Sequence, residues 1–191
     1  MNIIFATHNK NKIKEISELI PLSYNLQSLS DIGCLNEIAE TGQTMNENAV
    51  IKAQFVYENY KMNCFSDDSG LEVEALNGAP GVFSARYAGE PKNDVNNINK
   101  LLEELKNSTN RKAQFKTVIA LIFMGEKYFF EGVITGKISN EIFGTNGFGY
   151  DPVFVPDGYA ETFAQMKFET KNKISHRAIA VKKLVEFLKD S

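Results

Sequence analysis

Hydrophobic and polar residues follow two different periods along this chain, and the periods predict a series of strands and helices. Apolar residues recur at helical spacing between Ile13 and Ile20 and again between Ala178 and Leu188. Two long apolar segments flank the short turn Gly125-Glu126, which predicts an antiparallel hairpin. The predicted strands are 2–7, 24–29, 63–67, 71–75, 114–124 and 127–137, and the predicted helices are about 10–20, 45–61, 94–107 and 175–189.

Strands and helices are mixed along the sequence, which predicts an α/β protein with a mixed β-sheet and flanking helices. The chain has 191 residues, of which 43% are hydrophobic and 24% are charged, so it can bury a sizeable core. It contains no low-complexity tract, internal repeat or linker rich in Pro, Gly and Ser. We therefore expect a single domain over residues 1–191.

The charge and the cysteines exclude several classes of protein. A net charge of −3 creates no field that attracts a polyanion, so nucleic acid is a poor candidate and an anionic ligand needs a local cluster of cations. Cys34 and Cys64 form no C-x-x-C pair, which indicates a reducing compartment and gives no support to a zinc site.

The N-terminal lysines follow the apolar run instead of preceding it, and no apolar run could span a bilayer, so we expect a cytoplasmic protein.

The segment Ser66-Asp67-Asp68-Ser69-Gly70 places two carboxylates side by side after an apolar strand. Its residue types are typical of turns, so a turn is the simpler interpretation and a functional site is the alternative. If 64–68 is a strand, the two carboxylates point to opposite faces. One of them could then face a ligand while the other ties down the turn.

Residues 2–16 run from an apolar strand through Thr7–Asn9 into a helix whose first turns hold Lys10, Lys12 and Lys14. Cations at this end oppose the helix dipole by roughly 0.3–1 kcal/mol each, and a bound anion would resolve the conflict. Free backbone N–H groups and the lysines therefore predict a phosphate site. A solvated lysine face is an equally good interpretation.

The next segment has the spacing of a helix start. Thr44 and Glu47 match a capping box, so we expect a helix to begin near Thr44. Lys52 lies inside this helix, and Glu40 lies in the loop before it, where a carboxylate could face a cation. Taken singly, each of these two residues is more often a solvated surface charge.

Residues 144–159, GTNGFGYDPVFVPDGY, contain four glycines, two prolines and four aromatic residues, so they cannot form a regular helix. An exposed aromatic ring on such a loop could stack on a nucleotide base. Aromatic residues that plug the core are the alternative. Further along, Lys171 precedes a helix that opens with Ser175, His176 and Arg177, so cations again gather at a helix start.

Five motifs occur in order along nearly the whole chain: THNKNK, ETGQTMNENAVIKA, SDDSGLEVEALNGAPGVFSARYAG, NGFGYDP and KNKISHR. In this order they resemble the family of inosine triphosphate pyrophosphatases, also called the Ham1 type. The resemblance implies hydrolysis of ITP, dITP and XTP to the monophosphate and pyrophosphate with Mg²⁺. It also implies two lobes around a central nucleotide-binding cleft, a homodimer, and no nucleic-acid or membrane partner.

The resemblance also implies roles for individual residues. Asp68 matches the family's proton acceptor, and Glu40 and Asp68 match its Mg²⁺ ligands. Many members have glycine where this chain has His8, and a side chain there could tighten or redirect the phosphate loop. The substrate ligands that it implies are Thr7, His8, Asn9, Lys10, Asn11, Lys12, Lys52, Ser69, Phe148, Gly149, Tyr150, Asp151, Lys171, His176 and Arg177.

Base selectivity adds one more expectation, because inosine and xanthine carry a 6-oxo acceptor where adenine carries an amino donor. We expect His176 or Arg177 to donate to the 6-oxo group and Phe148 to stack on the ring. Two other functions stay open, a non-catalytic nucleotide-binding module and a Maf-like pyrophosphatase. Release of pyrophosphate would exclude the module, and the base preference would separate the two enzymes.

Overall fold

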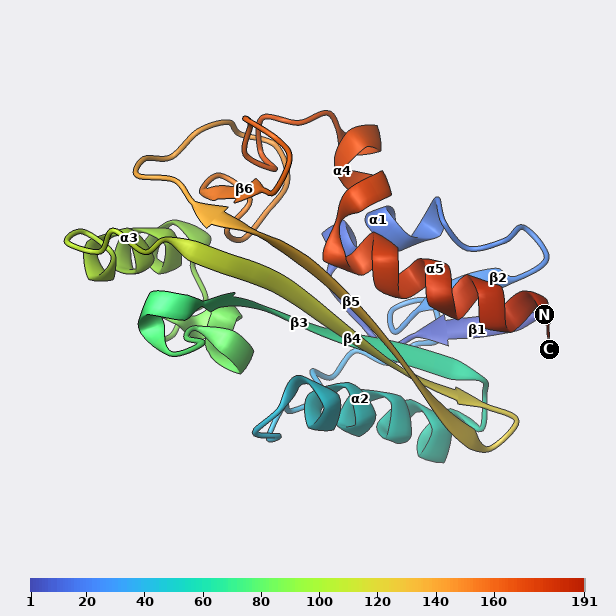
Figure 1. Cartoon of the computed structure of the whole chain (residues 1–191). Helices are drawn as coiled ribbons and strands as arrows, with labels where there is room; N and C mark the ends of the chain where they lie inside the picture. Colours follow the sequence, from blue (N-terminus) through green and yellow to red (C-terminus); the bar gives the residue numbers. More distant parts are fainter. Residues whose placement is uncertain (191) are drawn as a thin grey trace. The chain divides into compact units, whose positions relative to one another are not determined.

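The computed structural model describes residues 1–190 and contains one six-stranded mixed sheet with flanking helices (Figure 1). The strand order is β2-β1-β3-β4-β5-β6, with β1 parallel to β2 and β3, and β5 antiparallel to β6. This confirms the predicted α/β class. The elements are β1 Asn2–Phe5, α1 Lys10–Ser17, β2 Asn25–Ser28, α2 Met45–Tyr60, β3 Cys64–Val73, the 3-10 helices Glu74–Leu76 and Gly81–Arg86, α3 Asp94–Glu104, β4 Lys112–Phe123, β5 Glu126–Ile138, β6 Phe154–Pro156, α4 Phe168–Ile174 and α5 His176–Lys189.

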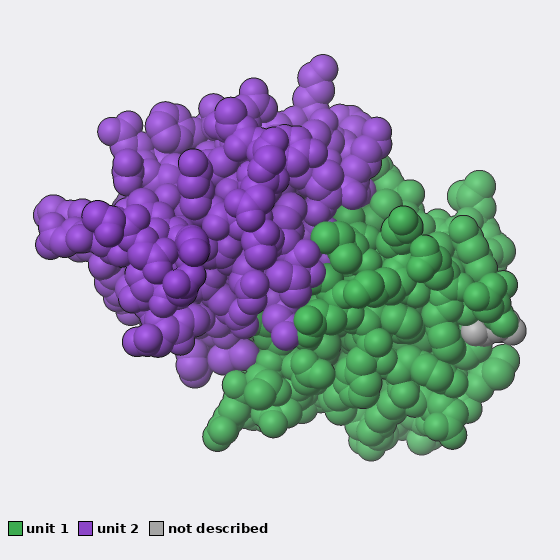
Figure 2. Space-filling model, viewed as in Figure 1, with its two compact units in different colours: residues 1–68, 117–132, 177–191 green, residues 69–116, 133–176 purple. Residues whose placement is uncertain are grey.

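The chain divides into two compact units, which Figure 2 draws in different colours. Unit 1 contains Met1–Asp68, Thr117–Gly132 and the chain from Arg177 onward, and unit 2 contains Ser69–Lys116 and Val133–His176. The boundaries fall inside β3, β4 and β5, so each of these strands contributes residues to both units. That the two units form the single domain expected from the sequence stays a prediction.

The largest correction to the predicted elements concerns the SDDSG segment, which forms no turn. Cys64–Val73 is one continuous strand through the two aspartates. The physical reason is that the polar side chains find partners on neighbouring helices instead of bonding to their own backbone. The Ser66 hydroxyl, for example, donates to the carbonyl of Ala49 in α2.

Other predicted elements are present with shifted ends. The capping box of Thr44 and Glu47 is confirmed, and α2 begins at the next residue after Thr44. The predicted hairpin joins β4 to β5, but its turn lies one residue earlier, at Met124-Gly125, where both residues have positive φ. The helix α4 and the short strand β6 were not predicted, since a seven-residue helix and a three-residue strand carry too little periodicity.

The core of unit 1 lies where α1 and α5 pack on the strands. Ile16 of α1 and Leu184 of α5 are fully buried with Phe5 and Phe65 in one apolar cluster. The two phenylalanine rings stack, with centroids 4.7 Å apart. Across the described residues, no helix is long and apolar enough to cross a membrane.

Residues of β3 alternate between this core and the helix α2. Phe65 points into the cluster with α1 and α5, whereas Cys64 and Ser66 donate hydrogen bonds to the carbonyls of Ala53 and Ala49 in α2. Because side chains along a strand point to opposite faces in turn, the next two residues must also divide between the two sides. This alternation decides where the adjacent aspartates go.

Unit 2 has its own core, which contains three phenylalanine rings. Phe115 and Phe154 make an edge-to-face contact with centroids 4.7 Å apart, and Phe163 lies 5.2 Å from Phe154. Ile98 and Leu101 of α3 complete the same buried cluster. Each unit can therefore hold its functional side chains on a packed base.

Candidate active site

Asp67 lies at the centre of a buried ion network in unit 1. Its Oδ1 accepts a hydrogen bond from Lys12 Nζ at 2.8 Å, and its Oδ2 accepts one from Arg177 Nε at 3.1 Å. Glu15 of α1 accepts a second hydrogen bond from the same guanidinium. The side chains of Asp67, Glu15 and Arg177 are at most 6% exposed. Two acids and two cations thus neutralise each other away from water.

The network sets the charge of each member. Burial by itself would raise the pKa of Asp67, but the charges of Lys12, Arg177 and Lys52 outweigh it and hold that pKa below the usual range. Burial also opposes the charge of Arg177, yet Asp67 and Glu15 raise the pKa of the guanidinium above its ordinary value. Asp67 is therefore fixed as a carboxylate, and a group that is already ionised and paired is a poor proton acceptor.

Asp68 lies on the other side of β3, toward α2. Its Oδ2 accepts a hydrogen bond from Asn48 Nδ2 at 3.2 Å, and its Oδ1 is 3.9 Å from Lys52 Nζ. Lys52 also donates to Glu40 Oε1 at 2.6 Å and to the backbone carbonyl of Asp67 at 2.6 Å. A cation on α2 thereby holds two carboxylates, one of which, Glu40, keeps 27% of its side chain exposed.

The environment of Asp68 raises its pKa, whereas that of Asp67 lowers the pKa of that acid. Burial raises the pKa of Asp68, and the charge of Glu40 adds to this increase against the cations Lys52 and Lys12. The pKa of Lys52 is also raised, because Asp67, Glu40 and Asp68 outweigh the effect of its burial. A carboxylate with a raised pKa and a loose contact to its cation can accept a proton.

The residues around Asp68 include two carboxylates that could hold a magnesium ion. No group of three His, Cys, Asp or Glu side chains with metal-ligand geometry exists within residues 1–190. Mg²⁺ in nucleotide enzymes takes one or two carboxylates and completes its shell with water and phosphate oxygens. Glu40 and Asp68, which share Lys52, supply such a pair, so the residues present fit the ion.

The segment 7–12 has a different geometry from the one expected. The Asn9 side chain caps α1 and accepts hydrogen bonds from the N–H groups of Asn11 at 2.9 Å and Lys12 at 3.3 Å. The expectation of free backbone N–H groups is therefore wrong for these two donors, because the cap occupies them. Thr7 Oγ1 accepts from the Asn9 N–H at 3.1 Å, and Lys10 is exposed.

His8 connects this segment to the loop that follows β2. Its Nε2 lies 3.2 Å from the carbonyl oxygen of Asn36, and its Nδ1 lies 3.4 Å from Ser30 Oγ. Both contacts lie at the surface of unit 1. The His8 side chain thus ties the segment 7–12 to another loop.

In unit 2, the Asp151 carboxylate organises the glycine-rich loop. Its Oδ2 accepts from the N–H of Phe148 at 2.9 Å and from Lys171 Nζ at 2.6 Å. A Cβ on Gly147 would meet this oxygen at 1.9 Å, and Gly147 has a φ of +76°, so glycine is required there. The Lys171 ammonium also lies 5.0 Å from the centroid of the half-buried Phe148 ring.

Two other predicted ligands of unit 2 are part of its core. Tyr150 is 4% exposed and its hydroxyl donates to the carbonyl of Ser84, so its ring plugs the core and cannot stack on a base. His176 is 4% exposed, and its ring stacks on Phe115 with centroids 4.6 Å apart. The N–H of Gly149 donates to Asp94 at the start of α3.

The structure brings the predicted residues into three clusters, two in unit 1 and one in unit 2. In unit 1, Glu40, Lys52 and Asp68 form one cluster, and Lys12 and Arg177 form the other around Asp67. In unit 2, Phe148, Asp151 and Lys171 meet, while Ser69 is the half-buried first residue of that unit. Sequence reasoning missed Glu15, although its position three residues after Lys12 puts both on one face of α1.

The sequence of this chain is similar to that of known proteins. The model of the Ham1 family matches residues 3–187. A protein of Christiangramia forsetii named dITP/XTP pyrophosphatase is 55% identical over 188 residues, which cover 98% of this chain and 99% of the relative. A Bacillus subtilis protein with the same name is 46% identical and covers 97% of this chain and 96% of its own length.

Two solved structures are similar to this structure over the whole chain. A Ham1 protein from Coxiella burnetii has a TM-score of 0.93 and 38% identity, and the match covers 100% of both chains. The Ham1 protein of Staphylococcus aureus has a TM-score of 0.91 and 41% identity, over 100% of this chain and 99% of that chain. These proteins therefore share the fold of this chain.

Proposed function

This chain belongs to the Ham1 family, and from that premise we propose that it hydrolyses non-standard purine nucleoside triphosphates to the monophosphate and pyrophosphate. The substrate class is that of its relatives, whose names give dITP and XTP, and the sequence motifs add ITP. One observation carries the proposal in the structure. Asp68 has a raised pKa and lies beside Lys52 and Glu40, while its neighbour Asp67 is neutralised by buried cations.

Asp68 is the proton acceptor in this proposal. A water molecule attacks phosphorus at the bond between the α and β phosphates and gives a proton to the Asp68 carboxylate. The bridging bond breaks, and the substrate leaves as the monophosphate and pyrophosphate, so one water is consumed for each turnover. Asp68 is available for this role because its Oδ1 makes only a 3.9 Å contact with Lys52, whereas Asp67 is paired with Lys12 and Arg177.

Mg²⁺ is the proposed cofactor, and Glu40 and Asp68 are the residues that would hold it. When bound, Mg²⁺ would neutralise the charge of the phosphate oxygens and help to orient them. Lys52 contributes a second positive charge close to the same carboxylates, at 2.6 Å from Glu40 and 3.9 Å from Asp68. A phosphate group can therefore be bound by this chain's own lysine as well as by the ion.

The remaining roles follow the three clusters of residues described above. We assign phosphate binding to the segment from Thr7 to Lys12 and to Lys52. We assign substrate contacts on the base side to unit 2, from Phe148, Asp151 and Lys171, since the Asp151 carboxylate binds both the backbone N–H of Phe148 and the Lys171 ammonium. The family resemblance also supports a homodimer, which light scattering on the purified chain would measure. A cytoplasmic location stays a prediction.

A panel of nucleoside triphosphates tests the proposed function. The purified chain is incubated with ITP, dITP, XTP, GTP or ATP in the presence and absence of Mg²⁺, and pyrophosphate and orthophosphate are measured separately. We expect pyrophosphate, dependence on Mg²⁺, and a preference for the first three substrates. Binding without turnover would instead support a nucleotide-binding module, and a preference for pyrimidine triphosphates would support a Maf-like enzyme.

A further inference from the structure

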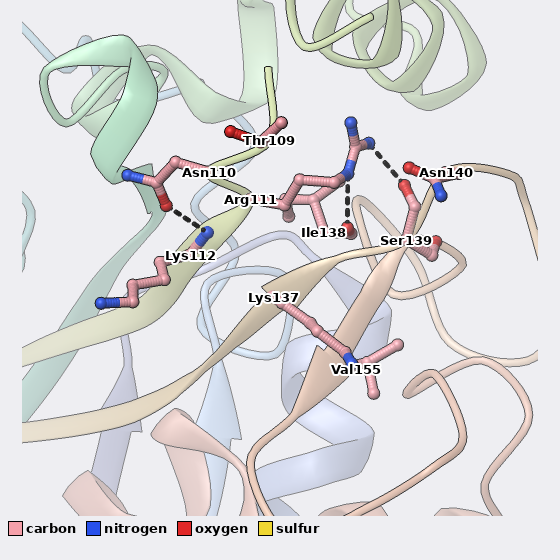
Figure 3. Close-up of a pocket in the computed structure, with 9 residues that line it drawn as sticks. All are labelled: Thr109, Asn110, Arg111, Lys112, Lys137, Ile138, Ser139, Asn140 and Val155. Carbon is pink, nitrogen blue, oxygen red and sulfur yellow. Dashed lines mark hydrogen bonds between the residues drawn. The ribbon is translucent and has the colours of Figure 1, made fainter. Parts of the chain in front are cut away.

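Unit 2 contains a basic pocket that is unrelated to the residues named so far. Its cavity is about 690 Å³ in volume, and it lies where β4 begins and β5 ends (Figure 3). This volume falls within the range of small-molecule sites, about 300–1,000 Å³. The lining residues that carry the argument are Thr109, Arg111, Lys112, Lys137, Ser139 and Asn140.

The lining of the basic pocket has an unbalanced charge. Arg111, Lys112 and Lys137 contribute positive charges, and no carboxylate lines the pocket. The chain as a whole has a net charge of −3, so such an excess of cations is a local feature. An anion that binds in this pocket would therefore meet cations and no carboxylate in the lining.

Arg111 is held rigidly at one wall. Its Nε donates to the carbonyl of Ile138 at 2.8 Å, its Nη1 to that of Leu105 at 3.0 Å, and its Nη2 to that of Ser139 at 2.6 Å. Figure 3 shows two of these bonds. A guanidinium has five N–H donors, so two of those of Arg111 have no acceptor within the described residues. A charge that is already fixed in place loses little entropy when a ligand binds.

The two lysines of the pocket, unlike Arg111, are not fixed by such contacts. Lys112 and Lys137 are exposed, and neither makes an ion pair among residues 1–190. Their side chains extend in different directions from the two strands in Figure 3. Since a lysine has a long flexible stem, both ammonium groups can move toward a bound anion.

A second, acidic pocket limits which ligands fit. It has a volume of about 520 Å³ and is lined by Lys112 together with Glu72, Glu74 and Asp157. Its carboxylates would repel a long polyanion that extended past Lys112, so an extended nucleic acid is disfavoured. A compact anion that stays close to Arg111 and Lys137 avoids them.

We propose that the basic pocket is a binding site for a compact diphosphate group, either free or on a small molecule. Arg111 provides the fixed donors, and Lys112 and Lys137 close on the remaining oxygens as flexible point charges. Thr109 and Asn140, which line the same pocket, provide additional polar contacts. None of these residues belongs to the proposed active site, so the site is an accessory one.

Inorganic pyrophosphate is the probe for this site, and backbone amide shifts of the ¹⁵N-labelled full chain are the readout. We expect saturable shifts at Arg111, Lys112, Lys137 and Asn140 with a Kd of about 1 mM or tighter, and a weaker effect of orthophosphate. A nucleoside diphosphate in a parallel titration distinguishes the sources of the group. Equal shifts by both ligands indicate that the diphosphate alone is recognised, and stronger binding of the nucleotide indicates a small-molecule carrier.

Two double variants make the test specific. Lys112→Gln with Lys137→Gln should weaken binding at these amides by at least about tenfold, because two charge-assisted contacts are lost. Lys92→Gln with Lys127→Gln removes the same charge from exposed lysines outside the pocket and should leave binding unchanged. Equal weakening in both double variants, or no saturable shift at the four amides in the wild type, would overturn the proposal. Thermal melts of both variants check that the fold is intact.

Discussion

Asp67 and Asp68 are adjacent in β3, yet their carboxylates are held on opposite sides of the strand. Lys12 of α1 and Arg177 of α5 bind Asp67, whereas Asn48 of α2 binds Asp68. Pairing with these cations lowers the pKa of Asp67, and burial raises the pKa of Asp68. Two like charges in sequence therefore have separate partners and can have separate roles, one structural and one chemical.

The first prediction concerns stability. Asp67→Asn leaves the buried cations Lys12 and Arg177 with less negative charge, so the free energy of unfolding should fall by about 3–5 kcal/mol. Asp68→Asn is the matched control, since that side chain makes one hydrogen bond and a longer contact to Lys52. Its effect should be about 1 kcal/mol. Urea denaturation of both variants measures this, and a larger loss in Asp68→Asn would contradict the assignment.

The second prediction concerns how the stability difference between the wild type and Asp67→Asn depends on pH. The folded pKa of Asp67 is lowered, so its contribution to stability is fully present above the unfolded pKa of about 3.9. It is lost as the pH falls through the lower, folded pKa. The gap between the wild type and Asp67→Asn should therefore stay constant from neutral pH to about pH 5 and close below about pH 4. A gap that widened in acid would have the wrong sign.

The third prediction concerns turnover. Asp68→Asn keeps the shape of the side chain but removes the proposed base, so kcat should fall by about 10²–10⁴ while the variant stays folded. Circular dichroism and a urea titration monitor the fold, and release of pyrophosphate from ITP measures kcat. A normal kcat in Asp68→Asn would show that another group accepts the proton.

The order of elements could be predicted from the sequence because periodicity and caps are local signals. The helix α2 begins where Thr44 and Glu47 place it, and the hairpin follows β4 as expected. The turn expected at Ser66–Gly70 is absent for a physical reason that no local signal contains. Helix residues far along the chain bind its polar side chains, and those tertiary contacts outweigh turn propensity.

The candidate site could be predicted only as a set of residue types. Motif order predicts Glu40, Lys52 and Asp68 as site residues. The pairing of Lys12 with Asp67 could not be predicted in this way, because it joins residues that are 55 positions apart in the chain. Glu15 was missed because an acid in a helix is most often solvated, and only packing against α5 reveals that it is buried. Partners of this kind depend on the tertiary fold.

The fourth prediction concerns His8. His8→Gly removes the contacts to Ser30 and Asn36 and adds backbone freedom, so the segment 7–12 should be less ordered and the KM for ITP should rise. Ser30→Ala removes only one of the two contacts and should raise the KM less. Both contacts are exposed, so each variant should lose about 1 kcal/mol of stability at most. A lower KM in His8→Gly would show that the side chain obstructs the phosphate instead of ordering its loop.

The last prediction is base selectivity. A site that reads a hydrogen-bonding pattern can discriminate by about 10⁴–10⁵, so kcat/KM for ITP should exceed that for ATP strongly and that for GTP clearly. The sequence predicts that His176 or Arg177 reads the 6-oxo group. The Arg177 guanidinium also holds Asp67 and Glu15, so Arg177→Ala would perturb the fold as well as recognition. Arg177→Lys keeps a positive charge and is the better variant. If Arg177→Lys lowers the ratio of kcat/KM for ITP to kcat/KM for ATP at unchanged thermal stability, Arg177 reads the base. An unchanged ratio would restrict Arg177 to the ion network. Equal kcat/KM for ITP and ATP in the wild type would contradict the proposed substrate class.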